Sequence, residues 1–262
     1  MSVIMRVNMS DLSITTEPVP EKWAGYGGRA LTDAIVFAEV PPMADPLGPE
    51  NKLVFAPGIL GGTTGPNTGR LSVGAKSPLT GGIKESNSGG TAAHALGRMG
   101  IAAIVIEGVP AEKLGSYVLR VFPDGKADIV HRHDLAGLGT YETVAVAKGI
   151  EASEHRMSEK ASFILIGPAG EMGMKAAGIA VTDPAGYPNR FAGRGGLGAV
   201  MGSKGLKLIA LFYEGLGATE HADRDAFNEA AKKFGAALRE HAVTGQGLPT
   251  YGTNVLANII NE

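Results

Sequence analysis

Residues 51–90 combine the residue types that could bind an anion. An apolar run at 53–56, typical of a buried strand, leads into a glycine-rich loop that ends at Arg70, and a second glycine-rich loop contains Asn87 and Ser88. Glycine lets the backbone turn at positive φ and lets N–H groups approach an anion closely. The planar guanidinium of arginine matches a phosphate. The segment therefore predicts a large, phosphate-bearing ligand that is held mainly by backbone.

A second segment of the same kind lies much further along the chain. Residues 187–198 place Arg190 and Arg194, four positions apart, among glycines and before an expected short helix. Amide groups at a helix start carry partial positive charge, and each charge-assisted contact contributes about 1.5–3 kcal/mol. Taken alone, this motif fits a pair of surface arginines as well as a phosphate clamp. Taken together with Arg70 and Asn87 in the first segment, the motif favours a phosphate clamp over a pair of surface arginines.

Both segments belong to a repeated pattern. Each half of the chain reads apolar strand, Gly/Pro turn, strand, polar residue, Gly-Gly, helix, Gly, strand and Glu-Gly, and the two copies end at Gly108 and Gly215. The repeat is too long for a solenoid and suggests two copies of one supersecondary unit facing each other. Convergent turn chemistry would also explain the pattern. If the duplication is real, the two polar segments should converge on one ligand with two similar ends.

The periodicity of apolar residues predicts the elements that position these loops. Strands are expected at 3–7, 12–16, 52–56, 71–75, 102–107, 117–122, 127–131, 162–166, 177–181 and 206–212. Helices are expected at 28–40, 90–99, 140–151 and 225–241, with Asp223 as the cap of the last. The composition changes near 215–219. We therefore expect one domain at 1–214 and the start of a helical second domain at 215–262.

The composition and charge of the chain exclude several classes of protein and of binding site. The chain has 262 residues, a formal net charge of −2 and 44% hydrophobic residues, enough for a sizeable core. Because no run of Lys or Arg forms a basic surface, we expect no nucleic-acid partner. The absence of cysteine excludes disulfides, thiolate zinc sites and cysteine-ligated iron–sulfur clusters within these residues. No apolar run reaches about 18 residues and no secretory signal pattern is present, so we expect a cytoplasmic protein without a membrane partner.

Several of these segments resemble those of a known family. Residues 51–90, 167–171 and 190–207, including the run from Gly196 to Lys204, are similar to the aldehyde:ferredoxin oxidoreductases, which are tungsten enzymes with a bis-pterin cofactor. The resemblance covers nearly the whole chain. It implies an α+β fold in which two similar β-rich halves form a base for the pterin, followed by the start of a helical domain.

The resemblance also implies a set of site residues. By motif match, tungstopterin would be bound by Arg70, Asn87, Ser88, Gly89, Arg190, Phe191, Gly193 and Arg194. The backbone carbonyls of Asn87 and Phe191 would complete the shell of a magnesium ion between the two pterin phosphates. Phe191 departs from the small residue usual in the family, which is harmless if only its backbone is used. The resemblance assigns no residue of this chain to catalysis.

For the whole enzyme, the resemblance implies oxidation of an aldehyde to a carboxylic acid by tungsten or molybdenum. Electrons would pass through a [4Fe–4S] cluster to ferredoxin or another electron-transfer subunit, and a homo-oligomer is possible. Family members are more than twice as long, and their cluster cysteines lie beyond residue 262. We therefore expect a truncated second domain and a fragment that is inactive alone. Two alternatives stay open: a non-catalytic or split-subunit module for a phosphorylated ligand, and a related tungsten enzyme acting on an aromatic acyl-thioester.

Other polar residues are weaker candidates. His131 and His133 alternate near a strand end, but two histidines are too few for a metal site. His94, on the helix after Gly90, either packs or faces the ligand. Lys76 and Lys204 either add charge near the phosphates or are solvated.

Overall fold

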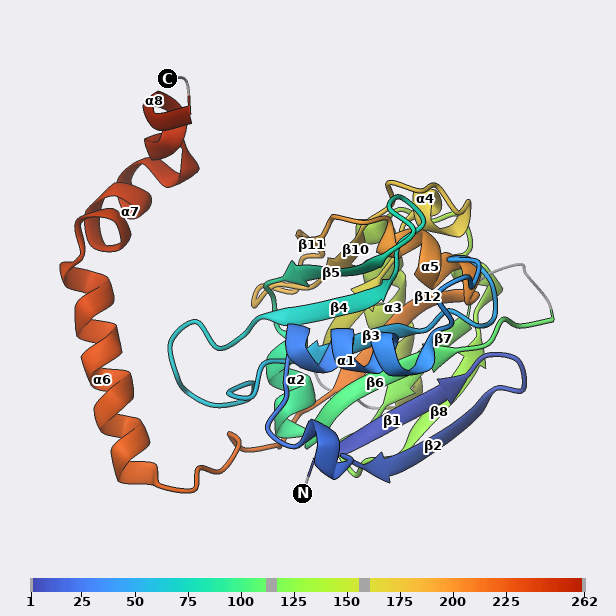
Figure 1. Cartoon of the computed structure of the whole chain (residues 1–262), viewed down its shortest axis with the longest axis horizontal. Coiled ribbons are helices and arrows are strands. Elements are labelled where there is room, and N and C mark those ends of the chain that lie inside the picture. The colour runs from blue at the N-terminus through green and yellow to red at the C-terminus, as the bar shows by residue number, and fades with distance from the viewer. Residues whose placement is uncertain (1, 112–116, 156–160, 261–262) are drawn as a thin grey trace. The chain divides into compact units, whose positions relative to one another are not determined.

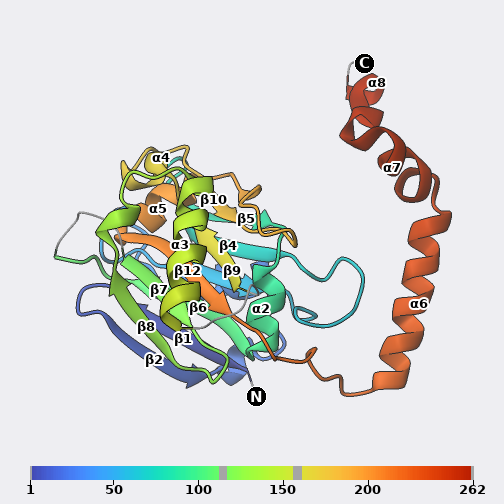
Figure 2. The same cartoon turned by 180° about the vertical axis from the view of Figure 1, so that it is seen from behind.

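The computed structural model describes residues 2–111, 117–155 and 161–260 (Figures 1 and 2). Contacts divide the chain into two units, residues 1–63 with 68–219 and residues 64–67 with 220–262. The predicted domains, 1–214 and 215–262, stay a prediction.

The first unit contains two mixed six-stranded sheets. Sheet A consists of β1 (Val3–Asn8), β2 (Ser13–Pro18), β3 (Leu53–Pro57), β4 (Leu71–Lys76), β5 (Ile83–Ser88) and β6 (Ile101–Glu107). Sheet B consists of β7 (Tyr117–Val121), β8 (Ala127–His131), β9 (Ala161–Leu165), β10 (Ile179–Val181), β11 (Arg190–Ala192) and β12 (Leu206–Phe212).

Sheet B repeats sheet A strand for strand. The orders are β2-β1-β6-β3-β4-β5 and β8-β7-β12-β9-β10-β11, so each strand of one sheet has a counterpart six places later. In both sheets the first and sixth strands pair in parallel and the other neighbours are antiparallel. Each parallel pair also skips one residue of the sixth strand, Ala102 or Lys207. These shared details confirm the internal duplication.

Helices complete a layered arrangement. They are α1 (Arg29–Glu39), α2 (Ala92–Arg98), α3 (Thr140–His155), α4 (Pro168–Glu171) and α5 (Leu197–Ser203), with short turns η1 (Glu21–Trp23) and η2 (His133–Leu135). One apolar cluster joins the facing sides of the two sheets with α2 and α5. Separate clusters join α1 to the outer face of sheet A and α3 to the outer face of sheet B. Figure 1 shows α1 in front of its sheet, and Figure 2 shows α3 in front from the opposite side.

The end of α1 is also attached to sheet A by charge. Arg6 donates to both carboxylate oxygens of Glu39 at 2.9 and 2.8 Å, and Lys52 Nζ donates to Glu39 Oε2 at 2.7 Å. Lys52 also donates to Glu107 Oε2 at 2.6 Å. Although burial alone would raise it, these hydrogen bonds hold the pKa of Glu39 at about 2.

The second unit is helical. It contains α6 (Arg224–Glu240), the π-helical turn η3 (Ala242–Gly247), α7 (Leu248–Tyr251), η4 (Gly252–Leu256) and α8 (Ala257–Ile260). Asp223 Oδ1 accepts a hydrogen bond from Ala226 N at 2.9 Å, which confirms the predicted cap. Within the described ranges, no helix combines the length and the apolar character that crossing a membrane requires.

The sequence predicts most elements within a few residues, but it misses β5 and β11. The sequence predicts a glycine-rich loop at 85–90, whereas 83–88 form a strand paired with β4. This strand lies at the edge of sheet A and its side chains are mostly polar, so it lacks the apolar alternation that marks a half-buried strand. The counterpart, β11, is only three residues long.

Candidate functional site

The two missed strands, β5 and β11, lie side by side at the edges of their sheets. The backbone N–H of Arg194 donates to Ser86 Oγ at 3.1 Å. Ser77 Oγ, which is buried, donates to the carbonyl of Gly195 at 2.7 Å. The two polar segments, one from each half of the duplication, therefore meet at one place, as the repeat predicts.

Three arginines surround this junction. Arg70, just before β4, is exposed, and its Nε donates to Asn87 Oδ1. The Asn87 side-chain amide in turn donates to Ser72 Oγ at 3.3 Å, which fixes the pair on sheet A. Arg190 and Arg194 are also exposed, and their guanidinium groups make no hydrogen bond or ion pair with other described residues. Three guanidinium groups are thus available to an anion.

The loop that leads into β11 has its own fixed geometry. Asp183 Oδ1 accepts hydrogen bonds from the backbone of Tyr187 at 3.0 Å and Ala185 at 2.9 Å, and Asp183 Oδ2 accepts one from Asn189 at 2.8 Å. The hydrogen bond from Tyr187, followed by those of the other two, lowers the pKa of Asp183. The carboxylate therefore stays ionised and sets the entry of the chain into Arg190.

The glycines of the junction fall into two groups. A Cβ on Gly90 would lie 2.6 Å from the carbonyl oxygen of Thr182, and one on Gly196 would lie 1.9 Å from that of Lys175. Both have positive φ, at +102° and +71°, so close packing and backbone conformation each require glycine. By contrast, a Cβ on Gly89 or Gly193 would be no closer than 3.6 Å to any neighbour. Gly89 and Gly193 are not required by the packing of the chain itself.

The remaining predicted residues differ in how much of them is accessible. Ser88 is 1% exposed and its Oγ donates to the carbonyl of Gly89 at 3.0 Å, so its side chain is directed inward. Phe191 is 53% exposed. Asn87 and Phe191 lie on the two adjoining edge strands, whose outer backbone groups have no neighbouring strand within their own sheet.

An open cleft of about 580 Å³ adjoins Arg70 on the side of sheet A that carries α1. It is lined by Gly28, Arg29, Ala30, Asp33, Gly58, Arg70, Ser72, Glu85 and Asn87. Arg29 Nε donates to Glu85 Oε2 at 3.3 Å, while Glu85 Oε1 is buried and has no hydrogen-bond partner among the described residues. Burial raises the pKa of Asp33, opposed by a hydrogen bond from Thr32. The cleft thus adds one ion pair, Arg29 with Glu85, and the carboxyl group of Asp33 beside the junction.

Comparison with known proteins identifies this arrangement. A family model described as the N-terminal domain of aldehyde ferredoxin oxidoreductase matches residues 4–212. The chain belongs to the aldehyde ferredoxin oxidoreductase family. It is 41% identical, over 98% of its length, to the tungsten-containing aldehyde ferredoxin oxidoreductases of Pyrococcus furiosus and Thermococcus kodakarensis. It spans 40% of the length of each of these relatives.

Two further proteins, named for other activities, are similar to this chain. An aliphatic sulfonate oxidoreductase, WOR-like subunit, from Pyrococcus furiosus is 30% identical over 76% of this chain and 33% of its own length. The solved active-site complex BamBC of benzoyl coenzyme A reductase, bound to 1,5-dienoyl-CoA, matches with a TM-score of 0.80 and 30% identity, over 91% of this chain and 34% of that chain. The likeness confirms the α+β fold with two similar halves.

Within this family fold, some sequence-based interpretations are wrong. Lys204 is buried, and its Nζ donates to the carbonyls of Asn51 at 2.6 Å and Gly48 at 3.0 Å. Lys76 Nζ donates to the carbonyl of Pro42. Both lysines hold backbone inside the protein, so neither is solvated or free for a phosphate. The helix start after Arg194 is also occupied, because Gly198 N donates to Ala177 O at 2.9 Å.

The candidate histidines contact other parts of the protein. His131 stacks on Tyr117 with ring centroids 4.5 Å apart, and His133 lies 3.9 Å from His131. No group of three metal-ligating side chains occurs within the described part of the chain. His94 packs against the loop before Arg70, where Gly62 N donates to its Nδ1 at 3.3 Å.

Arg29 and Glu85 are not among the site residues that the sequence predicts. Both line the cleft beside Arg70. The signal for Arg29 was present, because Gly27 and Gly28 directly precede it at a helix start. Glu85 has no such signal, because the polar side chains of β5 do not mark a strand in the sequence.

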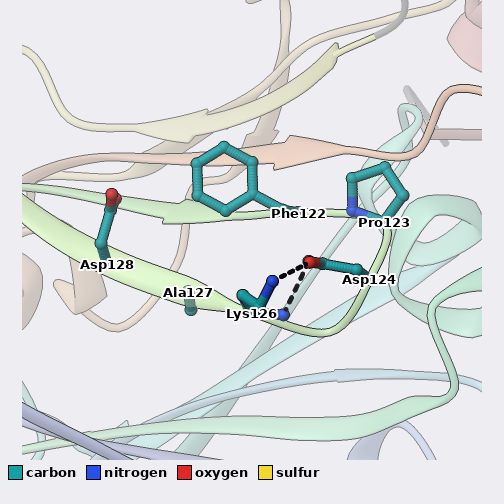
Figure 3. A pocket seen from close by; sticks show the side chains of 6 residues that line it. All are labelled: Phe122, Pro123, Asp124, Lys126, Ala127 and Asp128. Atoms are coloured by element: carbon teal, nitrogen blue, oxygen red, sulfur yellow. Dashed lines mark hydrogen bonds and ion pairs between the residues drawn. The ribbon is translucent and has the colours of Figure 1, made fainter. Parts of the chain in front are cut away.

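A second pocket lies away from the junction. It has a volume of about 520 Å³ and is formed by the predicted turn between β7 and β8, including Phe122, Pro123 and Asp128 (Figure 3). Lys126 and Asp124 form an ion pair of 2.8 Å across this turn. Because β8 and β11 are opposite edges of sheet B, this pocket does not belong to the candidate site.

Proposed function

We propose that this chain is the cofactor-binding N-terminal part of a tungsten- or molybdenum-containing aldehyde oxidoreductase. The observation that carries the proposal is the junction of β5 and β11, where each half of the duplication contributes exposed arginine and an unhindered glycine. A ligand with two similar anionic ends matches a junction built from two similar halves. The curated relatives are named as tungsten-containing enzymes, which supports the choice of metal.

The donor set fits a bis-pterin with two phosphates. Arg70, Arg190 and Arg194 would pair with phosphate oxygens, since each guanidinium has N–H groups not used within the protein. Gly89 and Gly193 would let phosphate approach the backbone, because neither position is filled by neighbouring atoms. The backbone of Ser88 would contribute beside them. The carbonyls of Asn87 and Phe191, on adjoining strands, would hold a magnesium ion between the phosphates.

When bound, the cofactor supplies the two-electron redox chemistry, and these residues position it and balance its charge. For the whole protein we propose a cytoplasmic enzyme that oxidises aldehydes to carboxylic acids. Its electrons would leave through a [4Fe–4S] cluster to ferredoxin or a comparable subunit. This chain has no cysteine, so the cluster ligands would lie outside these residues.

A related reaction is the second candidate. The match to the benzoyl coenzyme A reductase complex favours a tungsten enzyme acting on an aromatic acyl-thioester. The described residues include none that we assign to substrate selection. The two candidates therefore share the cofactor proposal and differ in the substrate.

The test uses the full-length protein purified without oxygen. We expect tungsten or molybdenum by elemental analysis, together with pterin detected by the fluorescence of its oxidised product. Aldehyde oxidation with a dye acceptor, compared with reduction of an aromatic acyl-thioester, then decides between the two reactions. An active preparation that contains neither metal nor pterin would refute the proposal. A stable protein that binds only a phosphorylated ligand, without metal, would support the non-catalytic module instead.

A further inference from the structure

His94 connects the two ends of the loop that leads to Arg70. Its ring lies on α2, half-buried, and Nδ1 accepts a hydrogen bond from Gly62 N at 3.3 Å. At the other end of the loop, a Cβ on Gly69 would lie 2.5 Å from Nε2 of the same ring. One imidazole therefore contacts residues 62 and 69, and the chain enters Arg70 directly after the second contact.

The first end of the loop has additional fixed contacts. A Cβ on Gly97 would lie 2.1 Å from the carbonyl oxygen of Gly61, so α2 approaches the loop backbone closely. Thr219 N donates to Gly62 O at 3.0 Å, and Thr219 Oγ1 donates to Gly61 O at 3.1 Å. At the second end, the imidazole itself packs against Gly69.

The contact to Gly62 requires the neutral imidazole. Nδ1 accepts a hydrogen bond only when it carries no proton, which leaves the proton of the neutral ring on Nε2. Burial, followed by the charge of Arg98 one turn later on α2, lowers the pKa of His94 below its ordinary value of 6.5. Residues 61–69 contain no titratable side chain, and the next residue, Arg70, is also cationic. The surroundings thus favour the neutral ring at pH 7.

We propose that His94 is a positioning residue for the cofactor site, whose neutral imidazole holds residues 62 and 69 together and so fixes Arg70 beside Asn87. Protonation places an N–H on Nδ1 facing the N–H of Gly62, which removes the hydrogen bond and puts two donors against each other. The first end stays attached through Thr219, while the displaced ring no longer links it to the second end and Arg70. Cofactor retention should therefore decrease in acid through this residue.

This inference depends on the proposed function only for its cofactor readout. The experiment compares the full-length protein with His94→Asn, whose side-chain oxygen can accept from Gly62 N and does not titrate, and with His94→Leu, which offers no acceptor. The first measurement is hydrogen exchange of a peptide covering residues 60–70 between pH 5 and 7.5, corrected for the intrinsic pH dependence. The second is metal and pterin retained per chain after incubation at the same pH values.

In the wild type, we expect exchange in 60–70 to become about fivefold faster in acid, the change expected for one neutral hydrogen bond, and cofactor retention to fall in parallel. His94→Asn keeps the acceptor for Gly62 N but not the ring beside Gly69, so its exchange in 60–70 should stay slower than that of His94→Leu at pH 7.5 and should show no such acid-dependent change. His94→Leu should show fast exchange and low retention at every pH. Identical pH profiles for the wild type and His94→Asn would overturn the inference, as would His94→Asn behaving like His94→Leu at pH 7.5. A wild type without metal or pterin refutes the proposed function instead, and the exchange measurement still tests His94.

Discussion

Lys204 provides a quantitative test of how the two halves are joined. It directly follows α5 in the second half, and its Nζ donates to the carbonyls of Gly48 and Asn51 in the first half. The side chain is fully buried. Burial lowers its pKa from the ordinary 10.5 to about 8. A neutral amine still has two N–H groups, enough for both carbonyls.

The sign and size of the pH effect follow from these values. Between about pH 8 and pH 10.5 the unfolded chain binds a proton at Lys204 that the folded chain does not, so the free energy of unfolding rises with pH in this window. The two pKa values differ by about 2.5, which at about 1.4 kcal/mol per pH unit corresponds to about 3 kcal/mol. Below pH 8 both states are protonated, and this contribution is absent.

The assay is urea unfolding at several pH values from 7 to 10.5. We compare the wild type with Lys204→Met, which keeps the length of the side chain and removes the titrating group. The difference in unfolding free energy between the two should shift by about 3 kcal/mol in favour of the wild type over this range. Lys175→Met, at an exposed position, is the matched control and should show no such shift. A pH-independent difference for Lys204→Met would refute the assignment of a buried, desolvated amine between the halves.

Three other changes test separate parts of the structure. Gly89→Ala should change the unfolding free energy by no more than about 1 kcal/mol while lowering the pterin content. Gly196→Ala should destabilise the fold by about 2 kcal/mol or more, because an added Cβ overlaps the neighbouring backbone and the residue has positive φ. Equal stability of the two variants in urea would contradict this difference between the glycines. Glu39→Gln should lower the unfolding free energy by about 3 kcal/mol at pH 7. This loss should vanish as the pH falls from 4.5 towards 2, where the wild-type carboxylate also becomes protonated. A loss that persists at pH 2 would contradict the stabilising role of the ion pairs with Arg6 and Lys52. Asp223→Ala should weaken the start of α6 by about 1 kcal/mol, seen as faster hydrogen exchange of the Ala226 amide, and unchanged exchange would exclude the cap.

Much of this fold could be predicted because its signals are local. Apolar runs marked ten of the strands, Asp223 marked the start of α6, and the Gly-Gly helices of the two halves revealed the duplication. The sequence could not show that the copies agree even in the skipped residue of each parallel strand pair, because register is set by contacts between distant strands.

The candidate site was harder to predict than the core. Its two strands lie at sheet edges, where side chains such as Lys84 and Asn87 are polar and the apolar alternation disappears. Burial of lysine was also not visible, since the carbonyls around Lys204 are brought there by a loop more than 150 residues earlier in the chain. Family resemblance supplied the residue set, whereas the structure separated glycines required for packing from Gly89 and Gly193.

The most direct test of the central claim is the metal and pterin content of full-length Arg194→Glu and Arg70→Glu, measured beside unfolding in urea. We expect each reversal of charge to lower bound metal and pterin strongly, while the unfolding midpoint of the cofactor-free protein stays near that of the wild type. Arg224→Glu, at an exposed position at the start of α6, is the matched control and should keep full content. Unchanged metal and pterin in both junction variants would contradict the claim that the β5–β11 junction holds the phosphates of the cofactor.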